Sequence, residues 1–347
     1  MLRVVNPLPS LAARRDGYQA DGASPSLPPI PGIDSVPYLT STSALELERL
    51  PKSLLVIGGG HIGCELGQMF ARAGVDVTIV DIVPILSAGE PEISKALAGY
   101  LREEGVVVRE NVRTKATRKT EHGIALDIST DAMDETLEAE QLLIATGRRP
   151  NTERLGLAEA GVGLLPNGGI KVDDRMRTSR PGTYAAGDVT GRDQFVYMAA
   201  YGAKIAAKNA LNGNGLRYDR TAMPAVVFTD PQVASVGFTE TAARAAGHDV
   251  QVSLLPLKQV PRALAARDTR GLVKLVVDAR SRKLLGAHIL APEGADSIQT
   301  AAMAIKSGMT VEQLGETIFP YLTTVEGLKL GALSFEKDVA KLSCCAG

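Results

Sequence analysis

The adjacent cysteines Cys344 and Cys345 are the side chains of this 347-residue sequence with the most specific chemistry. Neighbouring α-carbons lie about 3.8 Å apart, less than the roughly 4.4–6.8 Å that a relaxed disulfide spans, so a bridge between these two thiols is strained. Thiolates prefer soft cations, and a chain terminus can present a bound ion to a second site. We therefore predict that Cys344 and Cys345 bind a thiophilic metal. Two alternatives remain open: an accidental pair without function, and a prenylation box, which the terminal Gly347 fits poorly.

A glycine-rich turn predicts a second site. Residues 53–57 form a short apolar run typical of a buried strand, and the pattern G-x-G-x-x-G follows at once over residues 58–63. Gly58 permits the tight turn, Gly60 lets a pyrophosphate approach the backbone, and Gly63 lets the next helix pack on the strand. We predict that these three glycines bind a nicotinamide dinucleotide. A glycine-rich loop without a ligand is the alternative.

The elements around this turn predict how it is held. Apolar residues at helical spacing over residues 62–73 predict a helix, and residues 75–80 predict a second strand that ends at Asp81. An acidic side chain at this place accepts hydrogen bonds from the ribose 2′-hydroxyl and repels a 2′-phosphate. Asp81 therefore favours NADH over NADPH, unless its side chain merely points into solvent at the strand end.

The same domain continues in alternating elements. A helix is expected from Pro91, a strand over residues 106–108, a β-meander over residues 113–139 and a closing strand from residue 142. Together with the glycine turn, this order predicts a Rossmann-like α/β domain that binds a nicotinamide nucleotide.

Composition and charge exclude several classes of protein. The sequence has 38 basic and 39 acidic residues, a net charge of −1 and no basic run, so we expect neither nucleic acid nor a membrane as a partner. Its three cysteines form no disulfide framework, and no spanning segment or signal peptide is recognisable. We expect a cytoplasmic enzyme of two or three domains.

Two further motifs carry a resemblance to a known family. Residues 145–151 read Ala-Thr-Gly-Arg-Arg-Pro-Asn, and residues 183–188 read Thr-Tyr-Ala-Ala-Gly-Asp. They are similar to motifs of the flavin- and nicotinamide-dependent disulfide reductases, the group of glutathione reductase and dihydrolipoamide dehydrogenase. The resemblance implies FAD and NADPH or NADH as cofactors. It also implies cofactor contacts at Gly147, Gly187, Asp188 and Val196, and at Glu65 beside the nicotinamide.

The C-terminal third, from residue 219, resembles the dimerisation domain of that family. Strands are expected near Val226 and Val252 and over residues 272–277 and 284–289, with helices over residues 295–307 and 325–339. Such an α+β arrangement needs a partner layer, so we expect an obligate homodimer.

Tyr321 and Glu326 narrow the resemblance. The glutathione and dihydrolipoamide enzymes carry a His at the place of Tyr321, paired with a Glu that corresponds to Glu326. A phenol with a pKa near 10 is a poor base for a thiol, but it can hydrogen-bond a metal-bound thiolate. With the Cys344-Cys345 pair, this resembles the mercuric reductases, which reduce Hg(II) to Hg(0). The resemblance implies catalytic roles for Tyr321, Glu326 and both cysteines, while Thr323 and Glu326 also read as a helix capping box.

Some motifs of the family do not occur in these 347 residues. The first G-x-G-x-x-G, for the flavin adenosine, and a C-x-x-x-x-C redox pair are both lacking. We therefore expect an incomplete chain that shows no mercury-dependent oxidation of the nicotinamide nucleotide by itself. The expected domains are a remnant of the FAD domain and linker (1–40), the NAD(P)-binding domain (41–150), the second part of the FAD domain (151–218) and the dimerisation domain with its Cys-Cys tail (219–347).

The resulting hypothesis is a mercuric ion reductase that passes electrons from a nicotinamide nucleotide through FAD to Hg(II). The members of that family mostly use NADPH, whereas Asp81 favours NADH. Two alternatives stand beside it. One is a non-catalytic dimeric protein that binds a nicotinamide nucleotide and a thiophilic metal, and the other is a flavin disulfide reductase of the dihydrolipoamide dehydrogenase type.

Overall fold

The computed structural model describes residues 22–131 and 133–338, and its contacts divide the chain into two compact units. The first unit combines Met1–Leu27 with Gly147–Arg220, and the second combines Pro28–Thr146 with Thr221–Gly347. Both units are therefore assembled from segments that are far apart in the sequence. Within the described ranges, none of the helices has the length and apolar character that a membrane crossing requires.

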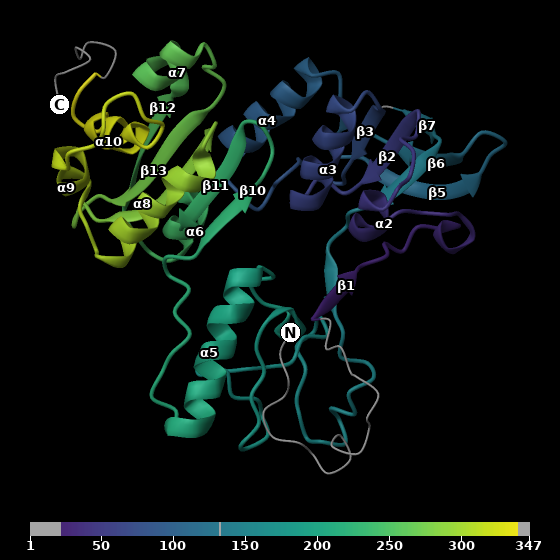
Figure 1. Cartoon of the computed structure of the whole chain (residues 1–347), viewed down its shortest axis with the longest axis horizontal. Helices are drawn as coiled ribbons and strands as arrows, with labels where there is room; N and C mark the ends of the chain where they lie inside the picture. Colours follow the sequence, from purple (N-terminus) through teal and green to yellow (C-terminus); the bar gives the residue numbers. More distant parts are fainter. Residues whose placement is uncertain (1–21, 132, 339–347) are drawn as a thin grey trace. The chain divides into compact units, whose positions relative to one another are not determined.

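A parallel four-stranded sheet with the order β4-β3-β2-β8 forms the α/β part of the second unit. Its strands β2 and β3 lie beside helix α3 in Figure 1. Strands β2, β3 and β8 are largely buried because helices pack against the sheet, as parallel sheets require, whereas the edge strand β4 buries only Val108. The predicted strand–turn–helix–strand succession is confirmed, and the third strand starts one residue later than expected. The elements are β2 (Ser53–Ile57), α3 (His61–Arg72), β3 (Asp76–Val80), α4 (Pro91–Glu103), β4 (Val107–Arg109) and β8 (Gln141–Ile144).

The predicted meander forms a separate antiparallel sheet of β5 (Arg113–Lys119), β6 (Ile124–Ser129) and β7 (Asp134–Ala139). The segment before the short helix α2 (Ser41–Leu45) also belongs to this unit. Leu39 forms a parallel bridge with Leu143, and the Thr117 N–H donates to the carbonyl of Pro31 at 2.8 Å. Residues 28–40, expected to belong to the FAD-domain remnant and linker, are thus held by the second unit.

The C-terminal part of the second unit is an antiparallel sheet with the order β10-β11-β14-β13-β12. Helix α8 packs on β11 and β14, and helix α10 packs on β12 and β13. The expected strands and both expected helices are present, but the last helix ends at Leu333 rather than near residue 339, and β11, α6, α7 and α9 were not predicted. The elements are β10 (Pro224–Val227), β11 (Gln232–Gly237), α6 (Glu240–Ala245), β12 (Val250–Pro256), α7 (Pro261–Ala266), β13 (Leu272–Asp278), β14 (Leu284–Ala291), α8 (Gly294–Lys306), α9 (Val311–Glu316) and α10 (Glu326–Leu333).

The first unit has its own small core. Strand β1 (Ala23–Pro25) pairs antiparallel with β9 (Arg148–Pro150), and helix α5 (Val196–Asn212) follows the short 3-10 helix η2 (Asp188–Thr190). Its buried residues include Ile170, Val172, Tyr184 and Ile205.

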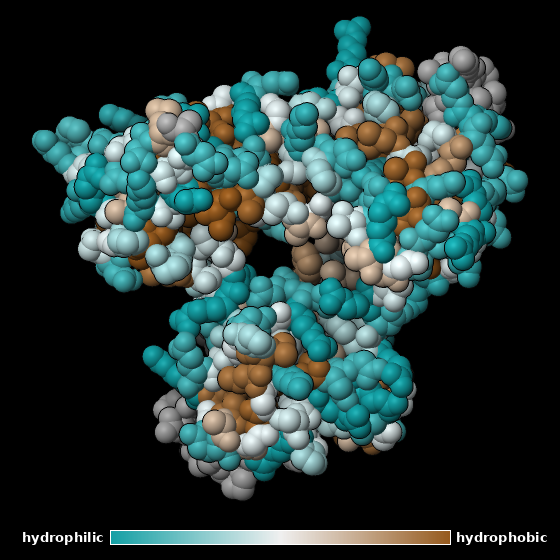
Figure 2. Space-filling model, turned by 180° about the vertical axis from the view of Figure 1, so that it is seen from behind, coloured by the Kyte–Doolittle hydropathy of each residue, from teal (hydrophilic) through white to brown (hydrophobic). Residues whose placement is uncertain are grey.

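Hydrophilic residues cover most of the face of the molecule in Figure 2, where apolar residues show as separate patches.

Candidate functional site

The turn between β2 and α3 is built so that only glycine fits at two of its positions. Gly58 has a φ of 108°, and a Cβ there would lie 2.4 Å from the carbonyl oxygen of Ala145. A Cβ at Gly63 would lie 1.8 Å from the carbonyl oxygen of Gly58. These two glycines are therefore required by the fold itself, because the turn and the first helical turn pack directly on backbone atoms.

Gly60 is different, because the fold does not need a glycine there. Its backbone is extended, with φ −77° and ψ −166°, and no atom lies within 4 Å of a Cβ built on it. Gly60 is the N-cap of α3 and makes no side-chain cap, so the first N–H groups of this helix are directed toward open space. This is the arrangement that a pyrophosphate needs, since the positive end of the helix dipole and the N–H groups of its first turn both favour an anion. The residues present fit a dinucleotide.

Asp81 is attached to the glycine turn and does not merely point into solvent. Its Oδ2 accepts a hydrogen bond from the Gly59 N–H at 2.6 Å, and its Oδ1 accepts one from the Val83 N–H at 3.2 Å. The carboxylate therefore lies beside the turn, at the end of β3, where a ribose hydroxyl is expected.

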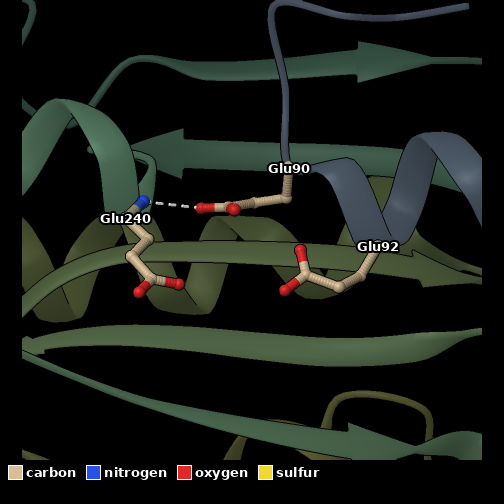
Figure 3. Close-up of side chains that lie close together, drawn as sticks. All are labelled: Glu90, Glu92 and Glu240. Carbon is tan, nitrogen blue, oxygen red and sulfur yellow. Dashed lines mark hydrogen bonds between the residues drawn. The ribbon is translucent and has the colours of Figure 1, made fainter. Parts of the chain in front are cut away.

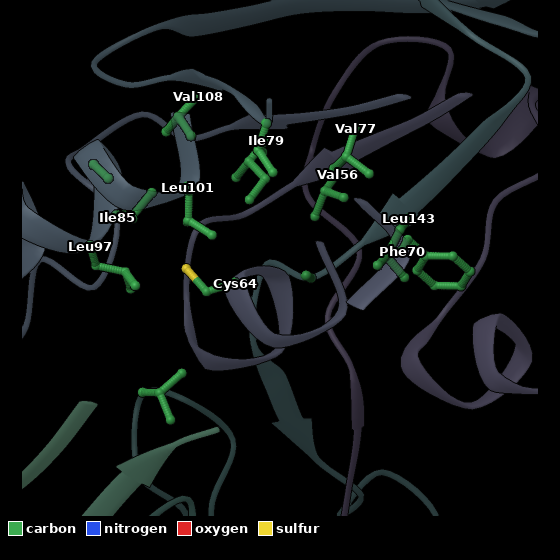
Figure 4. Packing of buried hydrophobic residues seen from close by; sticks show 14 of the residues in the cluster. Val56, Cys64, Phe70, Val77, Ile79, Ile85, Leu97, Leu101, Val108 and Leu143 are labelled. Atoms are coloured by element: carbon green, nitrogen blue, oxygen red, sulfur yellow. The ribbon is translucent and has the colours of Figure 1, made fainter. Parts of the chain in front are cut away.

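Cys64 lies under the same turn and is inaccessible. It is fully buried among apolar residues such as Val56 and Leu101 (Figure 4), and its thiol donates to the carbonyl of Gly59 at 3.3 Å. Burial, followed by the nearby charge of Asp81, raises the pKa of this thiol to about 12. Cys64 therefore remains protonated and acts as a small apolar residue, not as a nucleophile or metal ligand.

Glu65, the residue expected beside the nicotinamide, connects α3 to the C-terminal part of the same unit. Its Oε1 accepts a hydrogen bond from the Phe228 N–H at 2.7 Å. One helical turn later, Gln68 exchanges two hydrogen bonds of 2.8 Å with the backbone of Asp230. The helix that presents the glycine turn is thus held along one face by residues 228–230.

A buried charge cluster was not predicted from the sequence. Carboxylate oxygens of Glu90, Glu92 and Glu240 lie within 4.8 Å of one another around a common space (Figure 3). Such a group can bind a metal ion, but the ammonium of Lys274 lies 2.8 Å from Glu90, 2.9 Å from Glu92 and 3.0 Å from Glu240. Burial alone would lower the pKa of Lys274, but hydrogen bonds to the three carboxylates raise it above its ordinary value. The cation of this cluster is therefore the lysine.

A signal for this cluster was present in the sequence. Lys274 interrupts the apolar run of residues 272–277, and a lysine in a buried strand requires acidic partners. The position of Lys274 could have been recognised, but not its partners, which lie at the N-cap and first turn of α4 and at the start of α6.

The residues expected at the flavin belong to the first unit. The Gly147 carbonyl accepts from the Ser26 N–H at 2.9 Å, and Gly187 has a φ of 80° immediately before η2. A Cβ on Gly22 would lie 3.0 Å from the Cβ of Asp188, so the residue before β1 lies close to the start of η2. Val196 starts α5 with 84% of its surface exposed. The positive φ of Gly187 and the accessible start of α5 fit a ligand, and FAD bound here would supply two-electron redox chemistry.

Tyr321 and Glu326 lie in the segment around the start of α10. The capping box expected from Thr323 and Glu326 is not formed there. The N-cap of α10 is Val325 and makes no side-chain cap, while the Thr323 hydroxyl donates to the carbonyl of Pro320 at 2.8 Å. The capping-box interpretation is therefore wrong, because α10 begins at Glu326, which makes Val325 and not Thr323 the N-cap.

Glu326 is instead a buried carboxyl. It is 9% exposed, and its Oε2 has no hydrogen-bond partner among the described residues. Burial raises its pKa above the ordinary value, although a backbone hydrogen bond from Leu322 opposes this shift. Tyr321 is 52% exposed. Cys344 and Cys345 lie outside the described residues.

Comparisons with known proteins agree with these features. The model of the pyridine nucleotide-disulphide oxidoreductase family matches residues 19–206, and that of its dimerisation domain matches residues 223–332. The mercuric reductases of Lysinibacillus sphaericus, Streptomyces lividans and Shigella flexneri are 46%, 48% and 49% identical to the chain. Each alignment covers 94% of this chain, and the chain spans 60%, 69% and 58% of the respective relative.

Solved structures show the same relationship. The HOCl-induced flavoprotein disulfide reductase RclA from Escherichia coli, solved as a Cu(II) complex, has a TM-score of 0.82 at 34% identity, covering 91% of this chain and 71% of that one. LpdA from Mycobacterium tuberculosis has a TM-score of 0.81 at 29% identity, covering 91% and 68%. These matches confirm the expected fold class and the resemblance to flavin- and nicotinamide-dependent oxidoreductases. The chain belongs to the pyridine nucleotide-disulphide oxidoreductase family.

Proposed function

We propose that this chain provides the nicotinamide-nucleotide site and the metal-binding thiol pair of a mercuric reductase. The observation that carries this proposal is the 46–49% identity to mercuric reductases over 94% of the chain. That identity, together with the adjacent Cys344 and Cys345, favours Hg(II) as substrate over a disulfide. A free dithiol persists in a reducing compartment, which supports a location in the cytoplasm.

The nucleotide site in this proposal is the turn at Gly58, Gly60 and Gly63. The open space at Gly60 receives the pyrophosphate, and Asp81, beside the turn, accepts hydrogen bonds from the ribose hydroxyls. Glu65 lies one turn into α3, where its Oε1 accepts from the Phe228 N–H and its second carboxylate oxygen faces the nicotinamide end in this proposal. A 2′-phosphate would meet the charge of Asp81, so we propose NADH as the preferred nucleotide.

The flavin site in this proposal uses Gly147, Gly187, Asp188 and Val196. The positive φ of Gly187 and the close contact between Gly22 and Asp188 support a binding surface for one side of FAD.

The metal path in this proposal starts at Cys344 and Cys345. Two neighbouring thiolates give the second S–Hg bond a high effective concentration, so the pair binds Hg(II) far more tightly than either thiolate alone. Tyr321, half exposed, donates a hydrogen bond to a metal-bound thiolate, and the buried Glu326 follows it in the same segment. We propose a homodimer in which the thiol pair of one subunit supplies the ion to the other.

A competition titration tests the thiol pair. Hg(II) is titrated against a small dithiol with the wild type, Cys344→Ala, Cys345→Ala and the double variant, and Cys64→Ala is the matched control because that thiol is fully buried. We expect each tail variant to lose most of the affinity and the control to keep it. If both single variants hold Hg(II) as tightly as the wild type, the paired clamp is refuted. A chain that binds Cu(II) but not Hg(II) would favour another flavoprotein disulfide reductase.

A further inference from the structure

The segment after β3 closes around the glycine turn. The Leu86 N–H donates to the carbonyl of Gly59 at 2.9 Å, and the side chain of Ile85 is fully buried. A Cβ on Gly59 would lie 2.5 Å from the Cγ2 of Ile85. Residues 82–86 therefore fit against the turn without spare room, and the position of Ile85 determines the position of this segment beside Asp81.

Glu110 holds Ile85 in place. Its Oε1 accepts a hydrogen bond from the Ile85 N–H at 3.0 Å, and its Oε2 pairs with the Nη2 of Arg102 at 2.7 Å. The Glu110 side chain is 17% exposed, whereas that of Arg102 is 47% exposed. Glu110 is thus the less exposed partner of this ion pair, and both of its carboxylate oxygens are engaged.

Glu110 and Asp81 occupy equivalent places on neighbouring strands. Each follows the last residue of its strand, β4 and β3, which are parallel and adjacent. The Asp81 N–H also donates to the carbonyl of Arg109 at 2.9 Å. The charge of Arg109 is engaged by Glu135 at 3.1 Å. At this sheet edge, two carboxylates and the guanidinium of Arg102 therefore leave one net negative charge.

We propose that the Arg102–Glu110 pair is a specificity element for the adenosine ribose, with Glu110 as a positioning residue. This inference rests on the proposed dinucleotide site. Glu110 keeps residues 82–86 beside the ribose and keeps Arg102 occupied, so that no free guanidinium is available to a 2′-phosphate. A free ribose 2′-hydroxyl needs only the carboxylate of Asp81 as a hydrogen-bond acceptor. A 2′-phosphate is repelled by the net negative charge of Asp81, Glu110 and Arg102.

Two substitutions separate the two roles of Glu110. Glu110→Gln keeps an oxygen acceptor for the Ile85 N–H but removes the charge and releases Arg102. We expect NADPH to bind about 3- to 10-fold more tightly than to the wild type, while NADH affinity changes little, because one partly buried negative charge is removed and only the 2′-phosphate responds strongly to it. Glu110→Ala also removes the acceptor, so both nucleotides should bind more weakly.

Two further variants serve as controls. Adding Arg102→Gln to Glu110→Gln should abolish the gain for NADPH, because the released guanidinium provides it. Glu103→Gln removes an equal charge from an exposed position on α4, the helix that carries Arg102. It should change neither the NADH nor the NADPH affinity.

Calorimetric titration with NADH and NADPH measures all of these variants. A wild type that binds no dinucleotide refutes the proposed nucleotide site itself. A wild type that binds NADH, with a Glu110→Gln variant whose NADH-to-NADPH affinity ratio stays within twofold, refutes the specificity element and leaves the site intact. A wild type that binds NADPH more tightly than NADH also overturns the inference. A Glu110→Gln variant whose preference for NADH over NADPH shrinks, and returns when Arg102→Gln is added, supports it.

Discussion

Substitution of Gly60 separates ligand binding from folding more cleanly than any other change in this chain. The extended backbone of Gly60 is accessible to every residue, and a Cβ there meets nothing within 4 Å. Gly60→Ala should therefore change the stability of the free protein by less than about 0.5 kcal/mol, because the lost freedom of the unfolded chain offsets the poorer N-cap that Ala provides. Gly60→Val adds two methyl groups in the same open space and should leave stability within about 0.5 kcal/mol of the wild type.

The effect on the ligand should be large, because that open space is where the pyrophosphate approaches the backbone. We expect Gly60→Val to weaken NADH binding at least 100-fold, which corresponds to about 2.7 kcal/mol. Gly60→Ala should have a smaller effect in the same direction. Both affinities are measured by calorimetric titration, and stability is measured by urea unfolding.

Two glycines provide matched comparisons. Gly99 in α4 also has nothing within 4 Å of a Cβ built on its backbone, so Gly99→Ala should stabilise the protein and leave NADH binding unchanged. Gly63→Ala brings a Cβ to 1.8 Å from the Gly58 carbonyl oxygen and should destabilise the fold by roughly 1–3 kcal/mol. The reasoning is refuted if Gly60→Val binds NADH normally, or if it destabilises the protein as much as Gly63→Ala does.

Three further changes test the charges of the second unit. Asp81→Asn keeps an acceptor for the Gly59 N–H but removes the charge, so the preference for NADH over NADPH should shrink by about tenfold in titrations, and an unchanged ratio would contradict the role of Asp81. Lys274→Met leaves the 2% exposed Glu90 without its cation and should lower the free energy of unfolding in urea by about 3–5 kcal/mol. A decrease under about 1 kcal/mol would contradict the stabilising role of the Lys274 ion pairs. Because the folded-state pKa of Glu326 is raised, its protonated form stabilises the protein fully below the ordinary value of 4.5, and this contribution is lost as pH rises through the folded pKa. Stability curves of Glu326→Gln should therefore lie increasingly above those of the wild type as pH rises from 4 to 7, and parallel curves would rule out the raised pKa.

The elements whose signals are local could be predicted from the sequence. The strand at Ser53–Ile57, the glycine turn and the start of α4 at Pro91 were all recognisable, because period, turn chemistry and first-turn proline act within a few residues. The family was also recognisable from short motifs around Gly147 and Gly187. The assignment of Asp81 to the turn followed from its distance along the chain, and its hydrogen bond to Gly59 agrees with it.

The charge pairs and the start of α10 were decided only by the tertiary structure. Lys274 meets Glu90 across 184 positions of the sequence, and Glu110 reaches Ile85 across 25. Thr323 and Glu326 have the spacing of a capping box, yet α10 begins at Glu326 with Val325 as its N-cap, so Thr323 lies before the cap and its hydroxyl donates to the carbonyl of Pro320 instead. A local pattern indicates which kinds of partner a side chain can bind. Tertiary packing determines which partner it does bind, because packing brings together groups that are far apart in the sequence.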